Sequence, residues 1–430
     1  MLTLFQPILG LVVFMAICYV LSENRQRIDA KFVAWGLGLQ FILALVLLKL
    51  PVASDALALL AGLFNHIGKA AIAGTSFVFG YIGGGAAPFE VTNPAASYVF
   101  AFQTMPTVFL ISAIASVLWY LGWLQAMIGG MAWVFQRTMG LSGPVAFAGC
   151  ANVFFAMTEA IAMIAPTLKN LNRSELMQVM TVGMTTVASS MFLIYSQFMA
   201  PVVPNAMVHV LTASFIHLPA GLLFAHILVP PLPKTMAERV KEKMHKTTYA
   251  PSDAEGVFDA FFRGALNGIP IVVNCVVVLI AVLAVLHVAD ALVLAITTSL
   301  GFNALSLAKL LAFPFAPLAW LMGVPLAESL MAGELLGVKT VFNEFVALMS
   351  FSQLAGSITA PSALILSYAL VSFANIGTAG IMAGSLYALI PEKRKDISEL
   401  SLLCIVAGLF ATLSTGAIMA ILLTLGIMTL

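Results

Sequence analysis

Ionisable side chains are scarce in this sequence of 430 residues. Asp, Glu, Lys and Arg make up only 9% of it, whereas 61% is hydrophobic and the mean hydropathy is +1.06. A soluble domain carries roughly a quarter charged residues. The composition therefore excludes a water-soluble globular protein and predicts an integral protein of the lipid bilayer. The net charge of +1 gives no argument for a nucleic-acid partner, and we expect none.

Metal-binding and catalytic motifs are also missing. The four cysteines stand apart in apolar segments without CxxC spacing, and the six histidines have no metal-ligand spacing. The sequence contains no HExxH, GxSxG or P-loop motif, and no nucleophile–base pair marks an intramembrane enzyme. We expect no enzyme activity, no cofactor and no structural metal.

Long apolar runs dominate what is present. A helix needs about 20 apolar residues to span a bilayer, and eight segments qualify: 3–22, 32–50, 98–121, 176–200, 207–230, 269–289, 361–387 and 399–428. Two further stretches, 56–80 and 122–139, mix polar residues into an apolar helical pattern and are interpreted as interfacial helices. Stretches 142–171 and 315–358 are broken by Pro, Gly and carboxylates and are interpreted as re-entrant hairpins.

The cations favour one orientation of these spans. When successive loops are placed on alternating sides of the membrane, most of the 19 Lys and Arg residues fall on one side. Only four fall on the other side: Lys49, Lys69, Lys309 and Lys339. An excess of cations marks the cytoplasmic side. We therefore predict a protein of the inner membrane with both termini on the outer, periplasmic side.

The polar stretch 231–256 divides the chain into two comparable halves. Each half has a broken hairpin followed by a span interrupted by small and polar residues, TVGMTTVASSMF (181–192) and YALVSFANIGTAGIMAG (368–384). Two such halves of opposite orientation are typical of secondary transporters. We predict N-terminal scaffold and interfacial helices (1–139), a first transport repeat (140–230), a cytoplasmic loop (231–260), and a scaffold helix with a second transport repeat (261–430).

Carboxylates inside a membrane are costly and usually face a cavity or a partner. Glu159 and Glu344 favour a functional role by this reasoning. For Glu328 and Glu334, a helix-capping role is an equal alternative, and Asp290 is expected at an interfacial span end.

Neutral polar residues in the same regions allow two interpretations. Asn152 and Asn375 are suited to gripping a hydroxyl or a cation, or else to satisfying a broken helix end. The cluster Thr185, Thr186, Ser189 and Ser190 either bonds back to its own helix or lines a cation site. His217 and His226 are interpreted as helix–helix contacts, with proton relay as the alternative.

Four motifs together resemble the concentrative nucleoside transporter family: ANVFFAMTEA (151–160), NRSELMQVMTVGMTTVASS (172–190), GVKTVFNEFVA (337–347) and SYALVSFANIGTAGI (367–381). The resemblance implies an all-α polytopic membrane protein with eight transmembrane helices, two re-entrant hairpins and interrupted helices. It further implies an inverted-repeat transport domain that moves like an elevator on a trimerisation scaffold, in a homotrimer.

The resemblance also implies a site in three parts. A nucleobase site would use Met157, Thr158 and Glu159, and a ribose site would use Glu344, Phe373, Asn375 and Thr378. A cation site would use Asn152, Phe155, Thr186, Val187 and Ser190, mostly through carbonyl oxygens. Oxygen ligands suit Na⁺, and in a proton-coupled member Glu159 would be the carrier.

Two positions depart from the family pattern. Met157 stands where the family commonly has a glutamine that bonds the nucleobase, and a thioether cannot replace that amide. Thr378 replaces a serine but keeps the hydroxyl. We expect a cation-coupled nucleoside symporter with an altered base preference. A symporter of a modified nucleoside or another small polar solute is the alternative, and an ion channel is the rival of another class.

Overall fold

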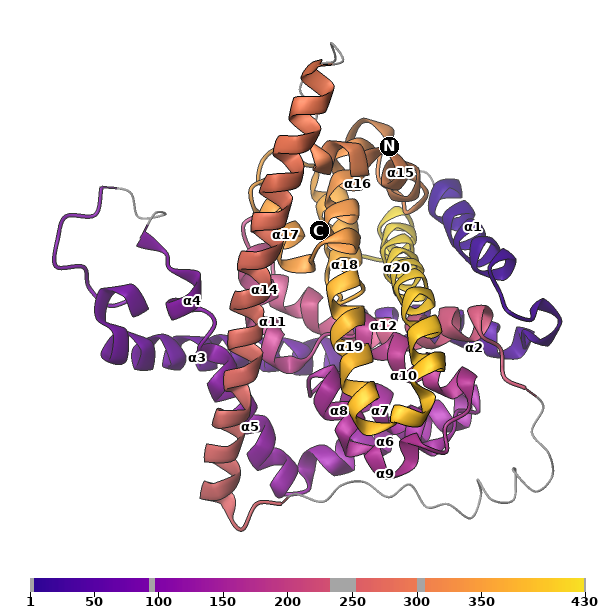
Figure 1. The fold of residues 1–430 in the computed structure, drawn as a ribbon, viewed down its shortest axis with the longest axis horizontal. Coiled ribbons are helices and arrows are strands. Elements are labelled where there is room, and N and C mark those ends of the chain that lie inside the picture. The colour runs from indigo at the N-terminus through magenta and orange to yellow at the C-terminus, as the bar shows by residue number, and fades with distance from the viewer. Residues whose placement is uncertain (1–3, 93–96, 233–252, 300–305, 429–430) are drawn as a thin grey trace.

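The computed structural model describes residues 4–92, 97–232, 253–299 and 306–428, and in these ranges the regular elements are helices (Figure 1). This agrees with the predicted all-α class. The apolar runs form helices because, without water, backbone N–H and C=O groups must bond within their own segment.

The chain begins with α1 (Phe5–Val20), the short η1 (Arg25–Arg27), α2 (Ala30–Lys49) and α3 (Pro51–Phe79). Asp29 caps α2 by accepting a bond from the Lys31 N–H, and Pro51 opens α3 at a position where it needs no amide hydrogen. In Figure 1, α3 runs crosswise to α14. Helix α3 with η2 is also long and apolar enough to span a membrane, so its interfacial placement stays a prediction.

A second group of helices frames one edge of the molecule. After η2 (Gly80–Gly83), it comprises α4 (Phe100–Gln103), α5 (Thr107–Tyr120), α6 (Trp123–Met139) and the long α14 (Val257–Ser299). Helix α14 packs along α5 at Gly264 and Gly268. A Cβ at Gly264 would stand 2.6 Å from the Ser112 carbonyl oxygen, so only glycine permits this approach.

The first repeat contains a hairpin and a broken helix. The hairpin consists of α7 (Gly143–Ala151), α8 (Met157–Met163) and α9 (Ala165–Leu168). The broken helix consists of α10 (Arg173–Thr185) and α11 (Ser189–Met199), bent by 43° at the break, and α12 (Ala206–Leu228) follows. The interruption predicted within 181–192 is therefore confirmed.

The second repeat has the same parts. It comprises α15 (Leu307–Leu321), α16 (Leu326–Val341), α17 (Glu344–Ser352), α18 (Ala360–Leu370), α19 (Ile376–Leu389), η4 (Pro391–Lys393) and α20 (Arg394–Thr424). The predicted interruption within 368–384 is the gap between α18 and α19. Figure 1 places α6 to α9 toward one end of the α18–α19 pair and α15 to α17 toward the other, as opposite hairpins require.

Helices α10, α12, α18 and α20 pack on one another and form the buried centre. Six described helices are long and apolar enough to span a membrane, or seven if α10 and α11 form one broken span. The helices α1, α15, α18 and α19 are apolar but shorter. The total of eight spans remains a prediction.

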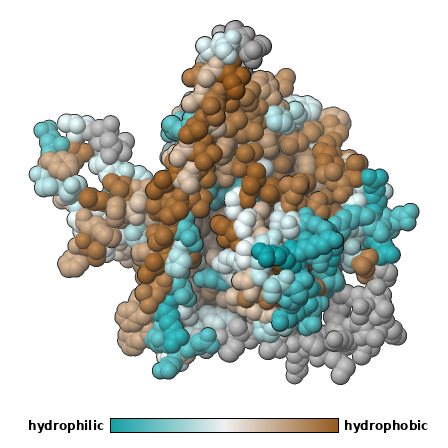
Figure 2. Space-filling model, in the orientation of Figure 1, coloured by the Kyte–Doolittle hydropathy of each residue, from teal (hydrophilic) through white to brown (hydrophobic). Residues whose placement is uncertain are grey.

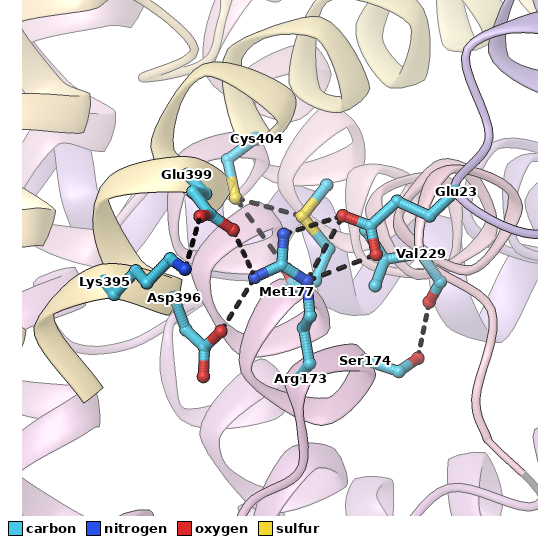
Figure 3. A network of polar contacts seen from close by, with 9 residues as sticks. All are labelled: Glu23, Arg173, Ser174, Met177, Val229, Lys395, Asp396, Glu399 and Cys404. Carbon is cyan, nitrogen blue, oxygen red and sulfur yellow. Dashed lines mark hydrogen bonds and ion pairs between the residues drawn. The ribbon is translucent and has the colours of Figure 1, made fainter. Parts of the chain in front are cut away.

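One guanidinium joins three segments of this packing (Figure 3). Arg173, at the start of α10, lies 2.7 Å from a carboxylate oxygen of Glu23 and 2.8 Å and 3.0 Å from those of Asp396 and Glu399. Asn172 caps the same helix end and accepts a bond from the Glu175 N–H. The network therefore ties α10 to α20 and to the segment after α1.

Several details differ from the sequence predictions. The expected hairpin start at 315 lies inside α15, and the span expected at 269–289 is only the middle of α14. Asp290 thus does not end this helix; its side chain accepts a bond from the Leu307 N–H at 2.6 Å and ties α14 to α15. Hydropathy could not reveal either result, because α14 continues through polar residues and the partner of Asp290 follows 17 residues later.

Lys339 requires another correction. The charge count assigns it to the outer side of the membrane, but it lies within α16 and is fully buried. Lys234, Arg239, Lys241, Lys243 and Lys246, counted in the predicted cytoplasmic loop, lie outside the described residues.

Candidate functional site

Glu344 is the centre of the best-defined polar cluster. Asn343 begins α17 by accepting a bond from the Phe345 N–H at 2.6 Å, so Glu344 takes the first helical position, where the helix dipole favours an anion. Its carboxylate is 2% exposed. It accepts hydrogen bonds from the Tyr195 hydroxyl at 3.0 Å and from Asn375 Nδ2 at 2.6 Å.

Asn375 is held at both ends of its amide. Its Oδ1 accepts a bond from the Thr378 N–H at 2.8 Å and caps α19, which fixes Nδ2 toward Glu344. The interpretation that this residue satisfies a broken helix end is therefore confirmed, whereas its contact with a ligand stays a prediction. The α18–α19 gap and the start of α17 meet through this one side chain.

An aromatic group lies beside the carboxylate. The Tyr195 ring centroid is 5.3 Å from that of Phe345 and 6.0 Å from that of Phe373. The sequence predicts Phe373 but not Tyr195. A tyrosine in the apolar run of α11 resembles ordinary packing, and only the hydroxyl's contact with Glu344 distinguishes it.

The tip of the first hairpin is the stretch between α7 and α8. At its end, the Ala156 N–H donates to Glu159 Oε2 at 3.1 Å, so Glu159 helps to begin α8. Glu159 is nevertheless half-buried and lines a cavity. The adjacent Met157 and Thr158 are half-buried as well.

This tip touches the break between α10 and α11. Ser189 Oγ donates to the Phe154 carbonyl at 2.6 Å. On the other side of the break, the Ser214 hydroxyl of α12 donates to the Val187 carbonyl at 2.9 Å and accepts from the Val187 N–H at 3.2 Å. Thr186 Oγ1 donates to the Val182 carbonyl of the preceding turn, so its hydroxyl bonds back to its own helix, as one of the two interpretations predicts.

Asn152 has an unpartnered atom at this junction. It ends α7 and donates Nδ2 to the Ala148 carbonyl at 2.9 Å, but Oδ1 is buried without a hydrogen-bond partner among the described residues. Buried carbonyl oxygens normally have a partner. Such an oxygen is suited to a cation or to a donor from a bound solute.

A cavity of about 540 Å³ opens beside the hairpin tip. Its lining comes from α5, the hairpin, α11 and α14, and includes Trp119, Phe155, Glu159, Ser190 and Asn267. The Trp119 ring stands edge-on to Phe155, with centroids 5.5 Å apart. The predicted residues Phe155, Glu159 and Ser190 thus share one cavity, which Glu344 and Asn375 do not line.

Met157 lies near Gly183 of α10 and Met382 of α19. A Cβ at Gly183 would stand 3.3 Å from Met157 Cβ and 2.4 Å from Met382 Cε. The hairpin tip, the first broken helix and the second one therefore converge at Gly183.

Other sequence candidates have structural contacts. Glu328 accepts bonds from the Thr359 N–H and hydroxyl, both at 3.0 Å, and so holds the start of α18. His217 Nε2 contacts the Tyr368 carbonyl at 3.0 Å, and His226 stacks on Phe32 with centroids 4.0 Å apart. The interpretation of both histidines as helix–helix contacts is confirmed.

Comparisons with known proteins agree with this arrangement. Models of the Na⁺-dependent nucleoside transporter N-terminus and C-terminus match residues 9–82 and 209–420, and a nucleoside-recognition model matches 101–202. An uncharacterized transporter of Bacillus subtilis, YutK, is 31% identical over 96% of this chain and 97% of its own length.

A rat sodium/nucleoside cotransporter is also 31% identical over 96% of this chain, which spans only 63% of that relative. A solved structure of CNTnw, in an inward-facing substrate-bound state, superposes with a TM-score of 0.88 at 30% identity and covers 99% of both chains. These relatives are transporters and not enzymes, and the chain is a multi-pass membrane protein. From the full-length match to YutK and the three family models, we conclude that the chain belongs to the Na⁺-dependent nucleoside transporter family.

Proposed function

We propose that this protein is a cation-coupled symporter that imports nucleosides across the inner membrane, with both termini outside. The observation that carries the proposal is the buried Glu344 carboxylate, fixed by Tyr195 and Asn375 between two helix starts. An apolar membrane protein retains such a carboxylate where it binds a polar partner.

A ribose offers the partner that this geometry requires. Its 2′ and 3′ hydroxyls are adjacent donors, and an ionised carboxylate accepts from both in charge-assisted hydrogen bonds. Phe373 would pack against the sugar, while Asn375 and Thr378 would complete its polar contacts. A solute without these hydroxyls would leave buried polar groups unpaired and would be rejected.

The coupling cation would bind where the hairpin tip meets the α10–α11 break. Asn152 would supply its unpartnered Oδ1, and Phe155, Thr186, Val187 and Ser190 would supply further oxygens. An oxygen-only set suits Na⁺. A proton carried by Glu159 is the alternative, and imposed gradients distinguish the two.

The nucleobase would bind at the hairpin tip, toward Met157, Thr158 and Glu159. Glu159 Oε1 has no hydrogen-bond partner among the described residues and can accept from a base N–H. Met157 offers only a thioether, which is why we expect a base ranking unlike that of members with glutamine there.

Transport would follow elevator-type alternating access in a homotrimer. The cavity is lined by α5, α14, the hairpin and α11, and a moving domain that contains the hairpin and α11 would slide along α5 and α14. Helix α14 contains a long apolar stretch, and outside its contacts with α5, α15 and α17 much of this hydrophobic surface is exposed (Figure 2). That surface would pack in the trimer or against lipid.

Uptake into proteoliposomes tests the proposal. Labelled uridine and adenosine would be offered while Na⁺, K⁺ and pH gradients are imposed in turn, with protein-free vesicles as the control. We expect accumulation driven by the Na⁺ gradient. Absence of nucleoside uptake under every gradient would reject the function, and ionic current without a substrate would favour a channel.

A further inference from the structure

Among the described residues, one cation and one anion stand out in the buried interior. Lys339 is fully buried and Glu344 is 2% exposed, whereas every other Lys, Arg, Asp and Glu side chain in the described ranges is at least partly exposed. They lie five residues apart, on opposite sides of the break between α16 and α17. An uncompensated buried charge is strongly unfavourable, so two opposite charges so placed must be considered together.

The partners of Glu344 do not balance its charge. Tyr195 and Asn375 are neutral donors, and the start of α17 adds only a partial positive charge. Lys339 interacts electrostatically with Glu344. Of the other nearby titratable groups, His217 interacts electrostatically with Lys339 and Cys275 with Glu344; neither brings a permanent positive charge to the carboxylate.

The ammonium is held away from the carboxylate. Lys339 Nζ donates to the Thr412 hydroxyl of α20 at 3.2 Å, and Thr412 in turn donates to the Leu409 carbonyl at 3.0 Å. No direct ion pair joins Lys339 to Glu344 among the described residues. A direct ion pair would occupy the carboxylate oxygens that a ribose diol needs, whereas an ammonium anchored on Thr412 compensates the charge and leaves those oxygens accessible.

We propose that Lys339 is a positioning residue, the fixed counter-charge of Glu344, and that Thr412 keeps it from competing with the ribose hydroxyls. The substrate part of this inference rests on the proposed function, because it takes Glu344 as the ribose acceptor. The charge pairing itself stands on the burial of both side chains and on their positions on either side of one helix break.

Comparing the affinities for two ligands distinguishes a positioning role of Lys339 from a purely structural one. Uridine and 2′,3′-dideoxyuridine share a base, but only uridine can use the carboxylate. In proteoliposomes, we expect Lys339→Met to lower the affinity for uridine about tenfold or more. The affinity for dideoxyuridine should change by no more than about twofold. Lys339→Arg should retain most of the uridine affinity. Equal losses for both ligands, or no loss, would overturn the proposal.

A second variant serves if Lys339→Met does not fold. Thr412→Val keeps the charge but releases the ammonium, which can then bond Glu344 directly. We expect weaker uridine affinity with unchanged dideoxyuridine affinity. Unchanged uridine affinity would contradict the anchoring role of Thr412.

Thermal unfolding in detergent tests the pairing without a substrate. Replacing both members of a buried pair costs less than leaving one charge alone, so Lys339→Met combined with Glu344→Gln should melt higher than Lys339→Met alone. If the two destabilisations add, the charges are not paired. This measurement decides the inference even if the wild type transports no nucleoside, in which case only the proposed function fails.

Discussion

Replacing Glu344 by glutamine tests the ribose site most directly. The carboxylate accepts from two fixed donors, Tyr195 and Asn375, and Asn375 cannot rotate its amide without giving up the Thr378 N–H. The introduced amide has one oxygen and one NH₂ group. If its oxygen accepts from Asn375, its NH₂ group faces the Tyr195 hydroxyl, which must then accept instead of donate. The site also loses the negative charge that strengthens its bonds to ribose hydroxyls.

The loss can be estimated from the same contacts. A hydrogen bond to a charged group contributes about 1.5–3 kcal/mol, so weakening two bonds to the ribose hydroxyls costs about 3–6 kcal/mol. Since each 1.4 kcal/mol is about a factor of ten, uridine affinity should fall roughly 10²-fold to 10⁴-fold. Uptake at ordinary substrate concentrations would be abolished.

The assay compares uridine uptake and binding by the wild type, Glu344→Gln and a matched control. Glu334→Gln makes the same chemical change at a half-buried carboxylate of the preceding helix, and we expect it to transport normally. Size-exclusion profiles confirm that each variant assembles. A uridine KM within about threefold of the wild type in a well-assembled Glu344→Gln protein would refute the reasoning.

Three further predictions concern neighbouring positions. Met157→Gln, which restores an amide at the hairpin tip, should change the ranking of uridine against adenosine in competition uptake; an unchanged ranking would mean that Met157 does not face the base. Asn152→Ala removes the unpartnered Oδ1 and should raise the Na⁺ concentration needed for half-maximal uptake, with recovery at high Na⁺; identical Na⁺ curves would place the cation elsewhere. Gly408→Ala should lower the thermal unfolding temperature, because its Cβ would stand 2.6 Å from that of Ala374 in the α18–α19 break, at a cost of about 1–3 kcal/mol; an unaltered transition would show that the break can shift freely.

Much of the fold could be predicted from local pattern. Apolar runs indicate the helices at 30–49, 206–228 and 394–424, and the small polar clusters at 181–192 and 368–384 contain both breaks. These signals are local, because a helix interruption needs polar or small residues at the interruption itself. The hairpin boundary inside α15 had no such signal.

Contacts between distant segments were harder to predict. The charge count assigns Lys339 to the outer side because it assumes that every lysine is solvated. The partner of its ammonium, Thr412, follows 73 residues later. Tyr195 shows its importance only through a hydroxyl that meets Glu344, 149 residues away. A single sequence carries no record of either pairing, although it does indicate Glu344 and Asn375 through the cost of polar groups in lipid.

The Arg173 network has a consequence for how the parts of the molecule could move. One guanidinium binds carboxylates from the segment after α1 and from α20 while it begins α10. These segments would separate only by breaking several charge-assisted bonds at once, so they should travel as a single rigid body. The sliding surface of the proposed elevator motion would then lie elsewhere, for example where α11 contacts α5 and α17 contacts α14.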